Sequence, residues 1–296
     1  MSKSRSVAWV VVAYILVAAA GVGVLLATTE QHPLLRMLLA DLAGTAVIFG
    51  FSRALNNSSM YDPYWSVAPI YIVGWWWMEA GLPAREALLM LAVCAWGGRL
   101  TWNFMRGWPG LVHEDWRYVD FREKTGRAYW LVSLTGIHLF PTLLVFAALL
   151  PAWQVLSPDV TIRESSVLTP PLSYGLDVLA LLVCLSAVAI QGIADNQLRA
   201  HRASKPPKGS ILDSGLWRYS RHPNYFGEVL FWWGIWLFGL AYQPYILWPI
   251  VGPLGITALF VFASVPMTDK KTLQSRPHYA EHMKKVSGLI PLPRRG

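Results

Sequence analysis

The hydrophobic residues of this chain are gathered into long runs that polar segments separate. A helix needs about 20 mostly apolar residues to cross the hydrocarbon core of a bilayer. Eight runs approach or reach this length, the third being the shortest, and they predict helices over residues 7–27, 34–51, 65–78, 87–105, 129–150, 172–194, 223–240 and 244–265. We therefore expect an all-α fold, a transmembrane helix bundle of seven or eight spans that forms one membrane-embedded domain over residues 1–296.

The composition supports a polytopic membrane protein. Of 296 residues, 54% are hydrophobic and only 14% are charged, whereas a soluble domain carries about 25% charged residues. So few charges could not cover a water-facing surface, which excludes a cytosolic enzyme, a disordered tail and a secreted disulfide scaffold. The two cysteines, Cys94 and Cys184, lie inside apolar runs, so we expect both to be small buried hydrophobic residues.

The basic residues predict which side of the membrane each loop occupies. Of the 25 Lys and Arg residues, 21 lie in the termini and in the polar segments that share their side. Only Arg36, Arg85 and Arg163 lie on the opposite side, and Arg99 falls inside a predicted span. Basic residues concentrate in cytoplasmic loops, so we expect both termini to lie in the cytoplasm. The protein would be a multi-pass protein of the bacterial inner membrane, or of the endoplasmic reticulum membrane if the source is eukaryotic.

Polar side chains gather near the cytoplasmic ends of four predicted spans. Ionisable groups inside spans are costly and usually functional. Seven polar or charged residues share this leaflet: Asp62, Arg99, Asn103, Gln191, Asp195, Asn224 and Glu228. These groups could simply pair with one another between helices, since buried polar groups need partners. Their confinement to one leaflet, beside the most basic loops, favours a polar ligand cavity in the cytoplasmic half of the bundle.

Helical spacing arranges several of these residues in stripes. Positions four residues apart lie on one face of a helix. One stripe contains Gln191, Asp195, Arg199 and Arg202, and another contains Asn224, Glu228 and Trp232.

The segment SGLWRYSRHPNYFGE over residues 214–228 indicates an anion site. Pro223 suits the first turn of a helix, and Arg218, Arg221 and His222 immediately precede it. The N-terminus of a helix presents free N–H groups and a partial positive charge, so with two arginines it would bind phosphate. Contact with anionic lipid headgroups is the alternative for such a loop.

At this motif the chain resembles a known family. The run RYSRHPNYFGEVLFWWGIW, the upstream DNQLRAHR and the terminal GLIPLP resemble the steroid 5-alpha-reductase family (3-oxo-5-alpha-steroid 4-dehydrogenases), and most closely its bacterial members. The resemblance covers a reductase core over residues 61–293 and leaves out residues 1–60. It implies an enzyme that uses NADPH to reduce the carbon–carbon double bond of a conjugated ketone, with 3-oxo-4-ene steroids converted to 5-alpha-3-oxosteroids, in a cavity between transmembrane helices.

The resemblance also implies roles for individual residues. The positions that match its cofactor site are Asn103, Arg106, Gln191, Asp195, Arg199, Arg202, Tyr219, Arg221, His222, Asn224, Tyr225, Glu228 and Trp232. The contact with the 2′-phosphate falls loosely on Met267 and Lys271, so the choice between NADPH and NADH is left open by this alignment.

The substrate end departs from the family pattern. The acidic residue that meets the ketone falls on Asp62, where the family commonly has Glu, and Trp65 and Trp96 join it at the substrate. The family's tyrosine aligns with Trp96, whose indole cannot deliver a proton. Catalysis would then rest on Asp62 with Arg99, or on Tyr64 or another tyrosine.

Other functions remain as alternatives. A methyltransferase of the isoprenylcysteine carboxyl type shares the RHPxYxG run and would use S-adenosylmethionine, but here the segment after the last span reads TDKK, without adjacent glutamates. A delta-14 sterol reductase-like enzyme shares the NADPH motif. A transporter or lipid-binding module would need a polar path through both leaflets. We expect a monomer that binds an apolar steroid or enone and membrane lipids, with no nucleic acid and no metal, because no Cys/His set has ligand spacing.

Overall fold

The computed structural model describes residues 2–157 and 170–295. These residues form helices joined by turns and loops, and neither range contains a β-strand. The all-α prediction is therefore confirmed for the described chain. Arg163, which was counted on the side opposite the termini, lies outside these ranges.

Five helical segments are long and apolar enough to cross a membrane, which is consistent with a multi-pass membrane protein. They cover Lys3–Ala27, Pro33–Ala54, Trp116–Ala148, Leu172–Ala203 and Trp248–Ser275. The other three predicted segments also fold as helices, namely α3 (Tyr64–Glu79), α4 (Ala87–Gly107) and α11 (Pro223–Tyr242).

The remaining helices are defined as follows. They are α1 (Lys3–Ala27), α2 (Pro33–Ala54), α5 (Trp116–Thr125), α6 (Tyr129–Val132), α7 (Phe140–Ala148), α8 (Leu150–Leu156), α10 (Pro170–Ala203), α12 (Val251–Leu259), α13 (Val265–Ser275) and α14 (Tyr279–Lys285). Short 3₁₀ turns include η1 (Ser58–Met60) and η5 (Trp248–Ile250), and π-helical turns at η3 (Ser133–Leu139) and η6 (Phe260–Ser264) join α6 to α7 and α12 to α13.

Several predicted boundaries differ from the structure. Helix α10 continues past the predicted end at residue 194 to Ala203, so the stripe that holds Arg199 and Arg202 is helical throughout. The last long helical segment begins at Trp248 in η5, later than the predicted residue 244. Pro249 lies in its first turn, where its missing N–H is not needed.

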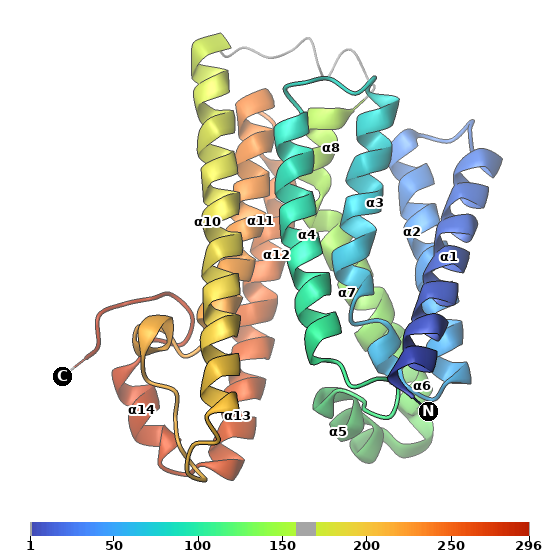
Figure 1. Cartoon of the computed structure of the whole chain (residues 1–296). Helices are drawn as coiled ribbons and strands as arrows, with labels where there is room; N and C mark the ends of the chain where they lie inside the picture. The colour runs from blue at the N-terminus through green and yellow to red at the C-terminus, as the bar shows by residue number, and fades with distance from the viewer. Residues whose placement is uncertain (1, 158–169, 296) are drawn as a thin grey trace.

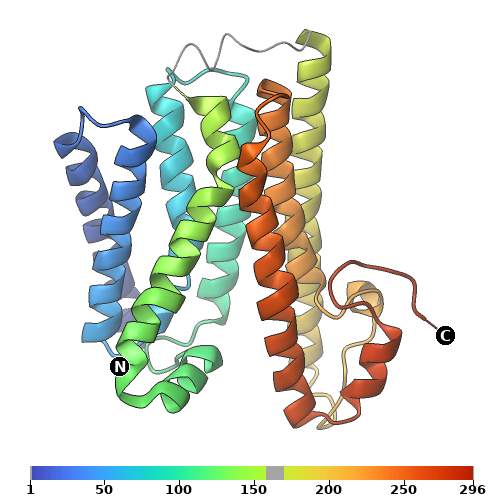
Figure 2. The same cartoon turned by 180° about the vertical axis from the view of Figure 1, so that it is seen from behind.

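The helices lie roughly side by side in one bundle (Figures 1 and 2). Helices α1 and α2 form one edge, α10, α11 and α12 form the other, and α3, α4 and α7 lie between them. Helices α5, α13 and α14 gather at the end of the bundle where the N-terminus and the C-terminal ends of α4 and α10 also lie. The predicted polar residues of α4 and α10 are therefore at this end.

Glycines allow α10 and α11 to approach closely. A Cβ atom added at Gly227 would lie 2.5 Å from Cγ of Gln191 and 2.9 Å from the carbonyl oxygen of Ala187. At Gly234 it would lie 2.5 Å from Sγ of Cys184. Small residues commonly permit such backbone approach between membrane helices. This contact brings the polar stripe of α10 against the polar stripe of α11.

Replacing Gly227 by alanine tests this close approach. The added methyl group meets backbone atoms of α10 that cannot move aside, so Gly227→Ala should destabilise the protein by about 1–3 kcal/mol. Gly175→Ala is the matched control, because nothing lies within 4 Å of a Cβ at that exposed helical position. Thermal unfolding in detergent should show a lower apparent melting temperature for Gly227→Ala than for Gly175→Ala. Equal melting temperatures would show that α10 and α11 do not depend on this contact.

Candidate functional site

The carboxylate of Asp195 joins three helices. Its Oδ2 accepts hydrogen bonds from Nη1 of Arg99 at 2.8 Å and from Nδ2 of Asn103 at 3.0 Å, both on α4. Its Oδ1 accepts from Nδ2 of Asn224 on α11 at 3.3 Å. Nη2 of Arg199, one turn further along α10, donates to Oδ1 of Asn103 at 2.8 Å. Five of the sequence-predicted residues are thus in direct contact.

A polar cavity of about 270 Å³ lies beside this network. Its lining includes Asn103, Gly107, Asp195, Leu198, Arg199 and Arg202. Nε of Arg199 is buried and finds no acceptor within the part of the chain that the structure describes. Nearby, Nη2 of Arg106 donates to Oδ1 of Asn196 at 3.0 Å. The cavity therefore offers guanidinium donors next to amide and carboxylate groups.

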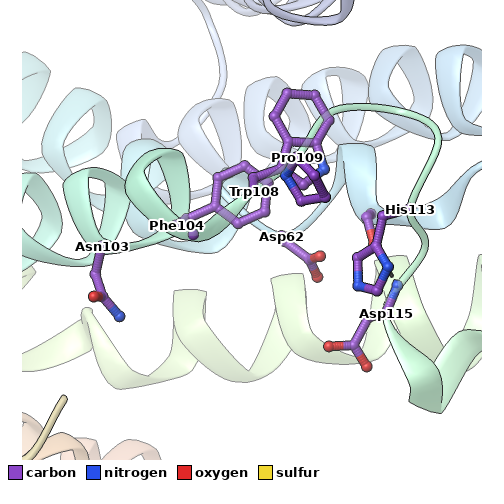
Figure 3. A pocket seen from close by; sticks show the side chains of 9 residues that line it. Asp62, Asn103, Phe104, Trp108, Pro109, His113 and Asp115 are labelled. Carbon is purple, nitrogen blue, oxygen red and sulfur yellow. Dashed lines mark hydrogen bonds between the residues drawn. The ribbon is translucent and has the colours of Figure 1, made fainter. Parts of the chain in front are cut away.

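A second cavity, of about 230 Å³, contains Asp62. Its lining comprises Ser59, Asp62, Asn103, Phe104, Gly107, Trp108, Pro109, His113 and Asp115. In the view of Figure 3, the Asp62 carboxylate lies between the Phe104 ring and the side chains of His113 and Asp115. Asn103 and Gly107 line both cavities, so the two cavities adjoin at the C-terminal end of α4.

Asp62 lies in the turn before α3 and receives a hydrogen bond from a tyrosine that the sequence analysis did not single out. The hydroxyl of Tyr118, on α5, donates to Oδ1 of Asp62 at 2.6 Å. Burial raises the pKa of Asp62 to about 6, although the Arg117 charge and the Tyr118 hydrogen bond act in the opposite direction. A carboxyl group with such a pKa exchanges protons near neutral pH.

Tyr64 and Arg99 are directed away from Asp62. The hydroxyl of Tyr64 donates to Oδ1 of Asp41 on α2 at 2.8 Å, and Arg99 pairs with Asp195. The structure therefore does not place Tyr64 beside Asp62, although Tyr64 lies only two positions further along the chain. Helix α3 begins at Tyr64, after Pro63, and its first turn directs Tyr64 toward α2.

Trp96 is fully buried in the core. Its Nε1 donates to both carboxylate oxygens of Glu228 at 3.2 and 3.0 Å, and its ring stacks on Phe231 with centroids 4.7 Å apart. Glu228 also accepts from Nε1 of Trp232 and from Nε2 of Gln191, each at 3.0 Å. Four predicted site residues thus form one buried group that joins α4, α10 and α11. The rings of Trp65 and Trp96 pack edge to face, with an interplanar angle of 67° and centroids 5.9 Å apart.

Arg221 and His222 bind the C-terminal segment of the chain. Arg221 donates through Nη2 to Oδ2 of Asp269 at 2.7 Å and through Nη1 to the carbonyl oxygen of Val286 at 2.6 Å. Nε2 of His222 lies 2.9 Å from Oδ1 of Asp269, which also accepts from the Tyr279 hydroxyl at 3.1 Å. The predicted phosphate site is therefore a buried ionic cluster in this structure, because Asp269 is the anion that these groups bind.

The two tyrosines of the same motif lie around this cluster. Tyr225 stacks on the His222 ring with centroids 5.1 Å apart, and its hydroxyl is 3.2 Å from that of Thr268. Tyr219 is exposed. Neither residue lines the two cavities described above.

Comparison with known proteins assigns the chain to a family. The model of a family described as "Protein of unknown function (DUF1295)" matches residues 48–286. The chain belongs to this family. An uncharacterized protein of Schizosaccharomyces pombe, C594.04c, is 26% identical over 286 residues, which cover 86% of this chain and 78% of the relative. No solved structure matches significantly. The DUF1295 match includes α3 to α13 and hence both cavities.

Sequence reasoning missed three partners of the predicted residues. Tyr118 is 56 positions from Asp62, and no helical or strand periodicity connects positions so far apart. Asp41 is the single acidic residue of the apolar run over residues 34–51, which was its only signal. Asp269 is the one acid of the segment TDKK, but nothing in that segment indicated that it would bind Arg221.

The ionic cluster predicts the behaviour of Asp269→Asn. The variant leaves the Arg221 guanidinium buried without its anion, and breaking such a pair typically costs about 3–5 kcal/mol. We expect a lower melting temperature and faster proteolysis after α13. Glu281→Gln is the control, because it breaks an exposed pair with Lys284 that should contribute little. The role of Asp269 as the anchor of the C-terminal segment would be refuted if both variants melted and were cleaved alike.

Proposed function

We propose that this DUF1295 protein is a membrane-embedded, NADPH-dependent reductase of the carbon–carbon double bond of a conjugated apolar ketone, with 3-oxo-4-ene steroids as the expected substrates. The observation that carries the proposal is the adjacency of the two cavities through Asn103 and Gly107. One cavity presents guanidinium groups suited to a polyanionic cofactor. The other presents a carboxyl group suited to protonate a substrate.

The residues of the first cavity fit a dinucleotide. Arg199 and Arg202 would face its phosphates. The buried Nε of Arg199 has no acceptor among the residues that the structure describes, and a bound anion would supply one. The Asp195 carboxylate would accept hydrogen bonds from ribose hydroxyls, and the Asn103 amide would donate to such hydroxyls or accept from them. When bound, NADPH supplies the hydride of the reduction.

Asp62 supplies the acid in this proposal. Addition of hydride to the β-carbon of an enone places negative charge on the ketone oxygen, and the α-carbon must then gain a proton. A donor aimed at such an oxygen contributes about 2.7–4 kcal/mol to catalysis in a dry site. Asp62 faces the cavity, and its raised pKa keeps part of it protonated near neutral pH. Phe104 and Trp108, whose rings stack with centroids 5.3 Å apart, would provide an apolar wall for the substrate.

The proposed topology brings each reactant from its own phase. The five long segments together with α3, α4 and α11 would form eight spans. An even number of spans would place both termini on the cytoplasmic side of the bacterial inner membrane, or of the endoplasmic reticulum membrane. The 21 basic residues on the side of the termini support this orientation. NADPH would then arrive from the cytosol and an apolar substrate from the bilayer.

A methyltransferase reading is disfavoured by the same cavities. S-adenosylmethionine carries a sulfonium cation, which Arg199 and Arg202 would repel, and Asp62 with Tyr118 has no role in methyl transfer.

Purified protein in detergent should oxidise NADPH when a 4-ene-3-ketosteroid is added, and the absorbance of the reduced nicotinamide should fall. Methyl transfer from S-adenosylmethionine in a parallel reaction, without NADPH oxidation, would overturn the proposal.

Asp62→Asn should lower turnover by about two to three orders of magnitude, because the amide cannot transfer a proton. NADPH affinity should be unchanged, since Asp62 lines the other cavity. Asp120→Asn is the control, as it removes a carboxylate on α5 that forms an exposed pair with Lys124. Steady-state rates and a fluorescence titration with NADPH measure the two effects. Full turnover of Asp62→Asn would remove this residue from the reaction.

Arg199→Ala should weaken NADPH binding by about 10- to 100-fold, the usual effect of losing a hydrogen bond to a charged group. Lys284→Ala removes one positive charge from an exposed position on α14 and should leave the affinity unchanged. The titration uses the fluorescence of bound NADPH at constant ionic strength. Equal affinities of the two variants would place the cofactor elsewhere.

A further inference from the structure

The segment that leads into α5, the helix that carries Tyr118, is hydrogen-bonded to the turn that precedes Asp62. The backbone N–H of Asp115 donates to Oγ of Ser59 at 2.9 Å, and Oε1 of Glu114 accepts from the backbone N–H of Ser58 at 2.7 Å. Nδ2 of Asn57 donates to the carbonyl oxygen of His113 at 2.9 Å. Helix α5 and η1 are therefore joined by several hydrogen bonds, which set the position of Tyr118 relative to Asp62.

Tyr118 reaches Asp62 from behind the cavity. Its side chain is buried and packs with Tyr129 and Ile137, and it does not belong to the lining of the Asp62 cavity. Its hydroxyl donates to Oδ1 at 2.6 Å. Tyr118 thus holds one carboxyl oxygen of Asp62, while Asp62 itself lines the cavity.

We propose that Tyr118 is a positioning residue that holds the Asp62 carboxyl with one oxygen toward the cavity and stabilises the carboxylate that remains after proton transfer. This role rests on the proposed function, and it deepens that function by naming the tyrosine that works with Asp62. In the step, the O–H bond of Asp62 breaks and its proton passes to the ketone oxygen, while the β-carbon gains the hydride that bound NADPH would supply. The resulting enol then takes a solvent-derived proton on its α-carbon as its hydroxyl proton is released to solvent. Tyr118 keeps its own proton and strengthens its hydrogen bond to the new carboxylate.

Other charged and titratable groups also act on Asp62. Arg117 favours the carboxylate, and Asp115 disfavours it. Tyr14 on α1 and Tyr61 beside η1 are electrostatically coupled to Asp62, and His113 shares its cavity. All of these groups are unchanged in a Tyr118→Phe variant, so a shift in that variant reports the loss of one hydrogen bond.

The sign of the effect follows from the charged form that Tyr118 stabilises. Without its donor, Asp62 holds its proton more tightly, so the pKa of Asp62 rises. A donor to a charged group typically changes a pKa by about one to two units. The rate of a reaction that needs protonated Asp62 falls as pH rises through this pKa. In Tyr118→Phe that fall should therefore occur about one to two pH units higher, with a maximal rate about tenfold lower and unchanged NADPH affinity.

Tyr242→Phe is the matched control, because it removes a buried tyrosine hydroxyl that donates to the Glu86 carboxylate instead. It should leave the pH profile where it is in the unaltered protein. Infrared difference spectroscopy of the protonated carboxyl band, assigned with Asp62→Asn, gives the pKa of Asp62 without any turnover. An unshifted infrared titration in folded Tyr118→Phe would overturn the proposal. If the unaltered protein reduces no enone, the proposed function fails, while the infrared titration still decides whether Tyr118 controls Asp62.

Discussion

The hydrogen bonds to the Asp195 carboxylate hold α4, α10 and α11 at one point. Burying a carboxylate is costly unless charged and polar partners surround it, and here Arg99, Asn103 and Asn224 provide them. Gly227 contributes by letting α11 approach α10 closely. Further into the bundle, Glu228 repeats the arrangement with two tryptophans and Gln191. Because α4 and α10 also form the walls of the first cavity, its shape depends on this network.

Asn103 connects the two halves of the candidate site. Its amide nitrogen donates to Asp195, its amide oxygen accepts from Arg199, and its side chain lines both cavities. An anion that engaged Arg199 would compete with Asn103 for its guanidinium. A reductase needs such adjacency, since cofactor and substrate must meet at about 3–3.5 Å.

Local patterns in the sequence predicted the helices and the polar stripes well. Asp195, Arg199 and Arg202 follow helical spacing, and the structure extends α10 through all three. The partners of Asp62 and Arg221 could not be predicted in this way, because Tyr118 and Asp269 approach them only through tertiary packing. Arg221 and His222 show this dependence on tertiary packing most clearly. Their basic motif predicts an anion site, and the anion that occupies it here is a carboxylate of the same chain. Tyr64 illustrates the converse, since closeness in sequence did not bring its hydroxyl to Asp62.

Transfer of deuterium from NADPH to the substrate tests whether this protein reduces an enone by hydride transfer. NADPH labelled with deuterium at the transferring position of the nicotinamide ring would be incubated with the purified protein and a 4-ene-3-ketosteroid in detergent. Mass spectrometry and NMR of the product then locate the label. The account predicts one deuterium on the former β-carbon and a solvent-derived proton on the α-carbon. A product with no deuterium, or with the label at another carbon, would contradict it.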